Sequence, residues 1–225
     1  VAGVVKGDGY GLGARPIARA LYGAGCRHFF VALLDEALAI RDLIPDAMLA
    51  VLGGPVPGSE PDYAAHDIVP VLGSLDEIDA WAARGQPCPA ILHIDTGMSR
   101  LGLDSRELSV LHQDPTRLRG IGLRYVMTHL VSAEAAHDPL NERQRRRFTE
   151  ACAGLPPVPR SFANSSGIFL GPAFGSDLAR PGAALYGINP TPGRPNPMRQ
   201  VVQLMGRVLA VRDIPAGATV GYNAT

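Results

Sequence analysis

Short apolar runs recur along most of the chain, and a stretch with helical periodicity follows most of them. The pattern predicts eight strands, at Val1–Val5, His28–Leu33, Met48–Leu52, Ile68–Leu72, Ala90–Ile94, Gly122–Thr128, Arg160–Phe162 and Gly182–Tyr186. Amphipathic stretches between them predict helices, among them Asp35–Ile44, Leu75–Arg84, Ser105–Gln113 and Pro139–Ala153. Asp35, Ser74 and Ser105 are the expected helix caps.

The predicted strands are apolar on both faces, which is typical of a parallel sheet covered by helices. Eight βα steps favour an α/β fold with a closed (β/α)8 TIM-like barrel, and we assign it to residues 1–188. Periodicity alone leaves an open, doubly wound sheet as the alternative.

The pattern changes after the last predicted strand. Residues 189–198 are rich in proline, which indicates a linker. Residues 199–225 contain two β-like runs around the turn Pro215-Ala216-Gly217, with no helix between them. We expect them to be the incomplete beginning of a second, all-β domain. The chain begins inside a strand, so we expect the barrel to be truncated at its N-terminus and any targeting signal to lie outside the sequence.

Composition restricts the function classes. The 225 residues are 46% hydrophobic, and 21 basic residues balance 21 acidic ones. A neutral chain of this kind predicts a globular protein that binds neither nucleic acid nor membranes. Cys26, Cys88 and Cys152 are far apart and odd in number, which favours reduced, buried thiols in the cytoplasm and predicts no metal site.

Polar residues gather where the predicted strands end. The first strand ends at Lys6, and "HIDTGMSRLG" (93–102), "MTHL" (127–130), "ANSSG" (163–167) and "DLARPGAALYG" (177–187) stand at later strand ends. Taken singly, each has a structural interpretation, such as a snorkelling lysine or a turn. Together they fall on one rim of the predicted barrel, which is where barrel enzymes carry their active sites.

These segments carry a resemblance to a known family. "VVKGDGYGLGA" resembles the lysine loop of alanine racemases, and "DTGMSRLG", "THLVSAE", "ANSSG" and "RPGAALYG" resemble four more blocks of that family in the same order. The resemblance implies a pyridoxal 5′-phosphate (PLP) enzyme with a barrel followed by a β-domain. It further implies a cytoplasmic homodimer with shared active sites, which interconverts L- and D-alanine, or another small amino acid, for the cell wall.

The resemblance also implies roles for single residues. Lys6 would hold PLP as a Schiff base and act as one catalytic base. Tyr10, Ser165 and the Gly182 N–H would bind the phosphate, and Asn164 would hold the loop that carries Ser165.

Three further residues would surround the rest of the cofactor. His129 would lie near the ring and hydrogen-bond Arg180, and Arg100 would contact the phenolic oxygen and the substrate carboxylate. Arg180 would face the pyridine nitrogen, where most PLP enzymes place an acid. An arginine cannot give up its proton there, so it favours racemisation over transamination. His93 replaces a lysine that commonly supports the arginine in the family, which puts that support in doubt.

Racemisation needs a base on each face of the reacting carbon. In the family, a tyrosine from the partner subunit's β-domain is the second base, and Tyr222 does not match it. We therefore expect the chain as given to be incomplete for activity. Two alternatives remain: a non-catalytic PLP-binding barrel, and a decarboxylase of the same superfamily. Arg180 argues against the decarboxylase, since those enzymes place a carboxylate at the pyridine nitrogen.

Overall fold

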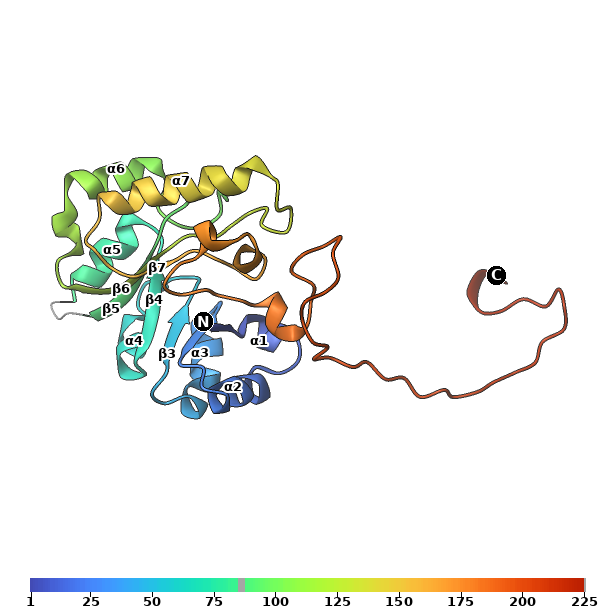
Figure 1. The fold of residues 1–225 in the computed structure, drawn as a ribbon. Helices are drawn as coiled ribbons and strands as arrows, with labels where there is room; N and C mark the ends of the chain where they lie inside the picture. The colour runs from blue at the N-terminus through green and yellow to red at the C-terminus, as the bar shows by residue number, and fades with distance from the viewer. Residues whose placement is uncertain (85–87, 225) are drawn as a thin grey trace.

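The computed structural model describes residues 1–84 and 88–224, in which seven parallel strands form one sheet in sequential order. The strands are β1 (Gly3–Val4), β2 (His28–Val31), β3 (Met48–Val51), β4 (Ile68–Leu72), β5 (Cys88–His93), β6 (Ile121–Met127) and β7 (Arg160–Ser161). Each pairs with the next strand of the chain, and helices lie outside the sheet (Figure 1). The prediction of a parallel α/β fold of the TIM-like barrel type is confirmed, and the open, doubly wound alternative is excluded by the strand order.

Seven helices accompany the strands in the described residues: α1 (Lys6–Tyr10), α2 (Ala14–Gly23), α3 (Leu34–Ile40), α4 (Glu60–Ala65), α5 (Leu75–Ala82), α6 (Ser105–Gln113) and α7 (Pro139–Ala153). In Figure 1, helices α2 and α3 lie in the lower half of the barrel and α5, α6 and α7 in the upper half, and both groups pack into one core on the outer face of the sheet. Short 3-10 segments occur at Arg41–Leu43, Pro115–Leu118, Gly167–Phe169, Pro172–Phe174, Ala183–Tyr186 and Tyr222–Ala224.

Of the three predicted helix caps, one is confirmed and two are displaced. The Ser74 side chain accepts a hydrogen bond from the Glu77 N–H, as an N-cap should. Helix α6 is capped by Asp104 instead of Ser105, because the Asp104 carboxylate accepts from two amides of the first turn. Asp35 lies inside α3, whose first turn is held by Glu36.

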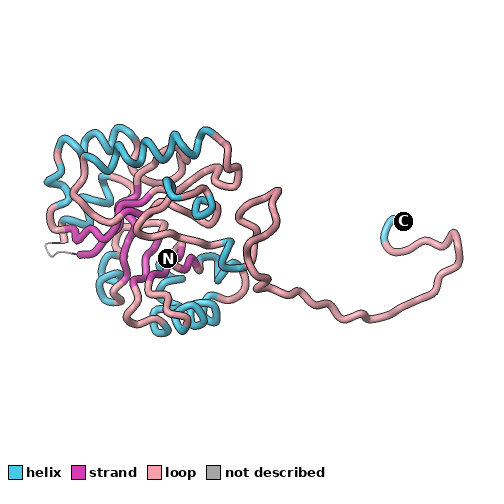
Figure 2. Tube along the Cα trace, viewed as in Figure 1, coloured by secondary structure: helices cyan, strands magenta, loops and turns pink. Residues whose placement is uncertain are grey.

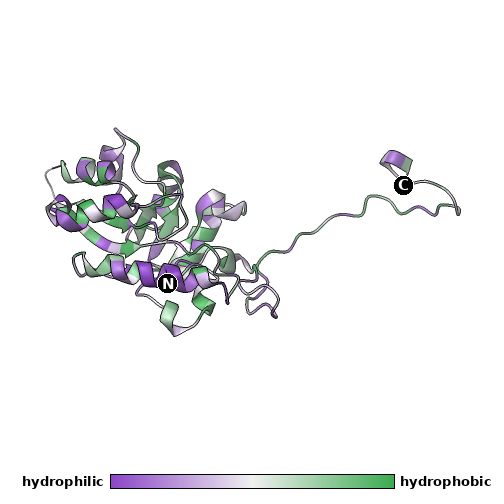
Figure 3. Ribbon diagram, turned by 90° about the horizontal axis from the view of Figure 1, so that it is seen from above, coloured by the Kyte–Doolittle hydropathy of each residue, from purple (hydrophilic) through white to green (hydrophobic). Residues whose placement is uncertain are grey.

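Alternation along the strands separates two apolar cores, as expected for a barrel. Phe29 and Val31 of β2 belong to the larger core between sheet and helices, whereas Phe30 points to the barrel interior. The interior is filled by a second cluster: Ala2, Val4, Phe30, Ala50, Val69, Val71, Ile91, Met127 and Leu178. Figure 3 shows hydrophobic residues concentrated on the central strands.

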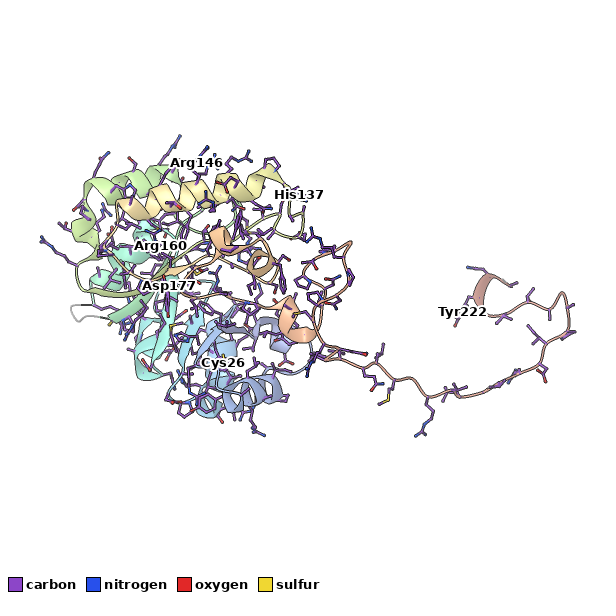
Figure 4. The ribbon with its side chains drawn as sticks, in the orientation of Figure 1. Cys26, His137, Arg146, Arg160, Asp177 and Tyr222 are labelled. Carbon is purple, nitrogen blue, oxygen red and sulfur yellow. The ribbon has the colours of Figure 1, made fainter. Side chains whose placement is uncertain are left out.

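The predicted eighth strand at Gly182–Tyr186 is wrong, because Ala183–Tyr186 form a 3-10 helix. Residues 178–181 connect the sheet edges instead. On the β7 side, the Leu178 N–H donates to the Arg160 carbonyl at 3.2 Å and the Arg180 N–H donates to the Ala163 carbonyl at 2.9 Å. On the β1 side, the carbonyls of residues 179 and 181 accept from the N–H groups of residues 2 and 4, at 2.8 and 3.2 Å. The Asp177 carboxylate fixes the start of this segment by accepting from the Arg160 N–H at 2.7 Å (Figure 4).

Residues 199–224 run away from the barrel as an exposed segment (Figures 1 and 2). The two predicted β runs form no strand in the described part of this segment, and Thr225 lies outside the described residues. Apolar side chains such as Leu204 and Leu209 have no sheet to pair with there. The division into barrel, linker and β-domain remains a prediction.

Two sequence expectations concern the whole molecule. Cys152 is buried, but Cys26 and Cys88 are only half-buried, so the expectation of three buried thiols is partly wrong. Within residues 1–84 and 88–224, no helix is both long and apolar enough to cross a membrane.

Candidate active site

The chain turns sharply at the end of β1, directly after the strand delivers Lys6. Gly7, Asp8 and Gly9 have φ values of 64°, 50° and 63°, and Tyr10 follows with 57°. Their amides bond in the helical manner, with Gly9 N–H to Val5 O at 2.9 Å, so this is one turn of left-handed helix. Only glycine adopts this conformation freely, which explains the glycines beside Lys6.

Asp8 and Tyr10 tolerate the left-handed turn at a cost of about 1–2 kcal/mol each. Asp8 has a local compensation, because its carboxylate accepts a 2.7 Å hydrogen bond from the Ala14 N–H, at the start of α2. Lys6 is the only lysine in the 225 residues, and the turn fixes the backbone beside it.

A cavity of about 210 Å³ opens at this end of the barrel. Seven of the eight predicted site residues line it, and these are Lys6, Tyr10, His129, Asn164, Ser165, Arg180 and Gly182. They come from the ends of β1, β6 and β7 and from the segment that connects β7 to β1. Larger cavities occur elsewhere on the described surface, but none of them contains Lys6.

One wall of the cavity combines hydroxyl and backbone donors. Ser165 Oγ accepts hydrogen bonds from the N–H groups of Gly182, at 3.0 Å, and Ala184, at 3.1 Å. A Cβ atom at Gly182 would lie 2.0 Å from the Tyr10 hydroxyl, so a side chain there would displace Tyr10 from this wall. Tyr10 stacks on Tyr186 with ring centroids 4.5 Å apart.

The loop that carries Ser165 is held by its neighbour. The Asn164 side chain donates to the Leu130 carbonyl at 3.3 Å and accepts from the Gly167 N–H at 2.9 Å. These bonds fix the start of the short 3-10 helix at Gly167–Phe169, as expected for a loop-holding role.

Arg180 is buried, with 3% of its surface exposed. Its guanidinium donates to Ser161 Oγ at 2.6 Å and to the Thr128 carbonyl, which ties the ends of β7 and β6 together. The expected hydrogen bond between Arg180 and His129 does not form among the described residues. The Arg180 guanidinium donates to Ser161 and Thr128 instead.

Arg100, the eighth predicted residue, lines an adjacent cavity with Gly73 and Glu77. Leu52 lines both cavities, so the two adjoin. The loop that carries Arg100 is fixed by Asp95, whose carboxylate accepts from three successive amides, including that of Ser99. His93 lies buried nearby, and no hydrogen bond joins it to Arg100 in the part of the chain that the structure describes.

The cavity is electropositive. Burial lowers the pKa of Lys6, and the nearby Arg100 charge lowers it further, while Glu36 opposes them. Burial, followed by the charges of Arg180, Arg100 and Lys6, lowers the pKa of His129 to about 3. His129 is therefore neutral near pH 7. A site of this kind favours an anionic ligand and a lysine that releases its proton more readily than usual.

Acid should destabilise the folded chain through two of these groups. The pKa of His93 is lowered to about 4, mainly by burial, and that of His129 to about 3, whereas both are 6.5 in the reference state. Between those values the unfolded chain binds more protons, so stability falls as the pH drops from about 6.5 toward 4. We expect urea unfolding to show a loss of about 2–4 kcal/mol between pH 7 and pH 5. His129→Asn should remove roughly half of that loss, and an unchanged pH dependence in the variant would contradict this account.

Sequence reasoning missed a buried polar network behind the site. Gln144 of α7 is fully buried and donates to Thr96 Oγ1 at 3.0 Å and to the His129 carbonyl at 2.9 Å. Thr96 and Thr128 share a 2.8 Å hydrogen bond, and Thr128 in turn accepts from Arg180. The sequence did contain a signal, because Gln144 is a polar residue on the buried face of α7. A buried side-chain amide requires hydrogen-bond partners, so its position indicated a polar network.

Comparisons with known proteins agree with the fold. The family model described as "Alanine racemase, N-terminal domain" matches residues 1–190. Alanine racemases of Acidiphilium cryptum and Rhodospirillum rubrum are 55% and 53% identical to this chain over its full length. The chain spans 64% and 61% of the length of these curated relatives.

Solved structures give the same answer. The biosynthetic alanine racemase of Pseudomonas aeruginosa matches all of this chain and 64% of its own, with a TM-score of 0.89 and 31% identity. Alanine racemase from Bartonella henselae, solved with covalently bound pyridoxal phosphate, matches 88% of this chain and 59% of its own, with a TM-score of 0.85 and 43% identity. The family model covers most of the chain, and both the curated relatives and the solved structures are alanine racemases. The chain therefore belongs to the alanine racemase family.

Proposed function

We propose that this chain is the cofactor-binding part of a PLP-dependent racemase that interconverts L- and D-alanine. The observation that carries the proposal is the position of Lys6. The only lysine of the sequence lines the one described cavity that also holds the predicted phosphate ligands. The covalent PLP of the Bartonella henselae relative supports the same assignment.

The residues present fit the cofactor. Tyr10 OH, Ser165 Oγ and the N–H groups of Gly182 and Ala184 converge on one wall, and together they suit a phosphate. Glycine at position 182 allows the Tyr10 hydroxyl to approach this wall closely. When bound, PLP supplies an electron sink that weakens the Cα–H bond of an attached amino acid.

Lys6 is proposed to attach the cofactor and to move the substrate proton. Desolvation and the Arg100 charge lower the pKa of its amine, so more of the amine is neutral near pH 7 than in a surface lysine. Lys6 Nζ can then take the Cα proton on one face of the substrate and return a proton to that face. Arg100, which adjoins the cavity, is proposed to bind the substrate carboxylate.

Arg180 is proposed to face the cofactor nitrogen. Burial lowers the pKa of Arg180 to about 10, and its guanidinium therefore remains protonated at neutral pH. A group that keeps its own proton cannot protonate the nitrogen. An unprotonated nitrogen would make the cofactor a weaker electron sink. This would favour prompt return of a proton to Cα and disfavour transamination. The protonated guanidinium also argues against the decarboxylase alternative, which needs a carboxylate there.

The larger assembly is part of the proposal. We infer that residues 1–188 are the barrel, that 189–198 are a linker and that 199–225 begin a β-domain. We further infer a homodimer in which the partner supplies the second base. Relatives longer than this chain support the added domain, since the chain covers 61–64% of them. The cytoplasmic location inferred from the cysteines stays a prediction.

The test is turnover in a completed protein, made by joining this chain to the portion of the Acidiphilium cryptum relative that it does not cover. With PLP added, we expect interconversion of L- and D-alanine, measured by chiral chromatography. Supplying L-serine to the same protein as the substrate, in place of L-alanine, tests whether it also acts on another small amino acid. PLP binding without any turnover of either amino acid would favour the non-catalytic, cofactor-binding alternative.

A further inference from the structure

A glutamate on helix α3 joins two elements at the base of the Lys6 turn. Glu36 Oε1 accepts a 2.6 Å hydrogen bond from the Gly7 N–H, 29 residues earlier in the chain. Glu36 Oε2 accepts from the N–H groups of Ala32, at 2.7 Å, and Leu33, at 3.2 Å. One carboxylate therefore connects the residue after Lys6 to the end of β2 and the start of α3.

The bond to Gly7 acts on a strained stretch of backbone. Gly7 is the first residue of the left-handed turn, and two non-glycine residues, Asp8 and Tyr10, follow in the same conformation. Strained backbone persists only where its surroundings hold it. Among the described residues, Glu36 is the one side chain from another element that hydrogen-bonds the backbone of this turn.

Glu36 also balances the charge around Lys6. The groups that line the cavity or act on Lys6 are two arginines, Arg100 and Arg180, and the titratable His129 and Tyr10. Burial and Arg100 lower the pKa of Lys6, and the Glu36 carboxylate raises it. Of the described residues, Glu36 is thus the acid that opposes the positive surroundings of the Lys6 amine.

We propose that Glu36 is a positioning residue for Lys6: its carboxylate holds the left-handed turn in place and sets the charge that the Lys6 amine experiences. Its importance for turnover rests on the proposed function, because a poised amine matters only if Lys6 attaches the cofactor and moves the proton. The geometry and the charge, however, belong to the chain without any ligand. They can therefore be tested separately from activity.

The fold offers a matched control in Glu107. Like Glu36, it occupies the third position of its helix, is half-buried and reaches back to its own helix start, accepting from the Asp104 N–H at 3.2 Å. Like Glu36, it also bonds a neighbouring βα connection, accepting from the Leu75 N–H at 3.0 Å. Leu75 lies outside the cavity that contains Lys6. Glu107→Gln therefore reproduces the structural loss without the proposed positioning effect.

The first measurement is amide hydrogen exchange in the 225-residue chain. Glu36→Gln should accelerate exchange at Gly7 by roughly 10–100-fold, because a charge-assisted hydrogen bond is replaced by a weaker one. Glu107→Gln should accelerate exchange at Leu75 and leave Gly7 unchanged. Equal protection of Gly7 in the wild type and in Glu36→Gln would overturn the bracing half of the proposal.

The second measurement is the pH dependence with which an acylating reagent labels Lys6, read by peptide mass mapping. The sequence holds one lysine, and fragment ions of the labelled peptide distinguish a label on Lys6 from one on the α-amino group of Val1. Glu36→Gln should shift the labelling curve toward acid, because the opposing carboxylate is lost. Glu107→Gln should leave it in place, and a residue with a merely structural role would not move it.

Glu36→Asp separates the two effects. Aspartate keeps the negative charge but is one methylene shorter, so Gly7 exchange should accelerate while the labelling curve of Lys6 stays closer to the wild type than that of Glu36→Gln. This variant also serves if Glu36→Gln does not fold. If Glu36→Asp and Glu36→Gln shift the curve equally, or if neither shifts it, the charge effect is refuted. Failure of racemisation in a completed wild-type protein would refute the proposed function and leave both measurements interpretable.

Discussion

Replacing Lys6 with alanine should lower alanine racemisation in the completed protein by about 10³-fold or more, because one residue is proposed both to attach the cofactor and to move the Cα proton. The variant should also lose covalent PLP. Borohydride makes a lysine–cofactor link irreversible, and peptide mapping of the wild type should then place the label on the peptide that contains Lys6. No label should remain on that peptide in Lys6→Ala, since Lys6 is the one lysine of the 225-residue chain.

Lys6→Arg is the matched control for charge. Arginine keeps a cation at the end of β1 but does not release its proton at neutral pH. If Lys6 acts as a base, Lys6→Arg should be about as inactive as Lys6→Ala while its fold, followed by thermal unfolding, is kept. Racemisation near the wild-type rate in Lys6→Arg would show that the cation alone suffices, and it would remove Lys6 from the catalytic role.

Replacing Arg180 with glutamine should have the second largest effect, and it should appear in both stability and chemistry. The guanidinium is buried and bonds Ser161 Oγ and the Thr128 carbonyl. Losing two charge-assisted hydrogen bonds should lower the free energy of unfolding by about 2–4 kcal/mol. If Arg180 faces the cofactor nitrogen as proposed, the neutral glutamine should raise the ratio of transamination to racemisation in the completed protein, because the charge that opposes protonation of the nitrogen is gone.

Arg180→Lys distinguishes the scaffold from the chemistry. Lysine keeps the positive charge but lacks the planar fork, so it cannot satisfy both Ser161 and Thr128 with the same geometry. Its stability should therefore fall almost as far as that of Arg180→Gln, while the ratio of transamination to racemisation stays low. If both variants lose stability and keep the wild-type ratio, Arg180 is only a link between β6 and β7.

Much of the site followed from the rule that chemistry lies at the carboxyl ends of barrel strands. Lys6, His129 and Ser165 follow three different strands, and the structure brings them to one cavity. The family resemblance supplied Tyr10 and Gly182, which the strand pattern alone would not select. Arg100 was expected in the same site, and it lines the adjoining cavity instead.

The errors have a common physical cause, which is that hydrogen-bond partners are not visible in a local pattern. "GAALY" looks apolar enough for a strand, yet the backbone that joins β7 to β1 is the four residues before it. The segments after residue 199 have strand-like composition, but a strand also needs a neighbour to pair with. Glu36 escaped notice because a helix-start glutamate is a common capping feature, and its bond to Gly7 depends on how β1 and β2 pair.

The way in which the barrel closes sets the order in which the site can form during synthesis. Tyr186 donates to the Val4 carbonyl across a separation of 182 residues, and residues 178–181 bond β1 directly. At ribosomal rates of about 5–20 residues per second, roughly 9–35 seconds pass between the appearance of Lys6 and that of Arg180 and Gly182. Throughout that interval the first strand lacks one of its two neighbours, so the nascent chain carries Lys6 without the finished pocket that lowers the pKa of its amine. PLP capture is therefore a late event, and chaperones that shield the early strands would act before the cofactor does.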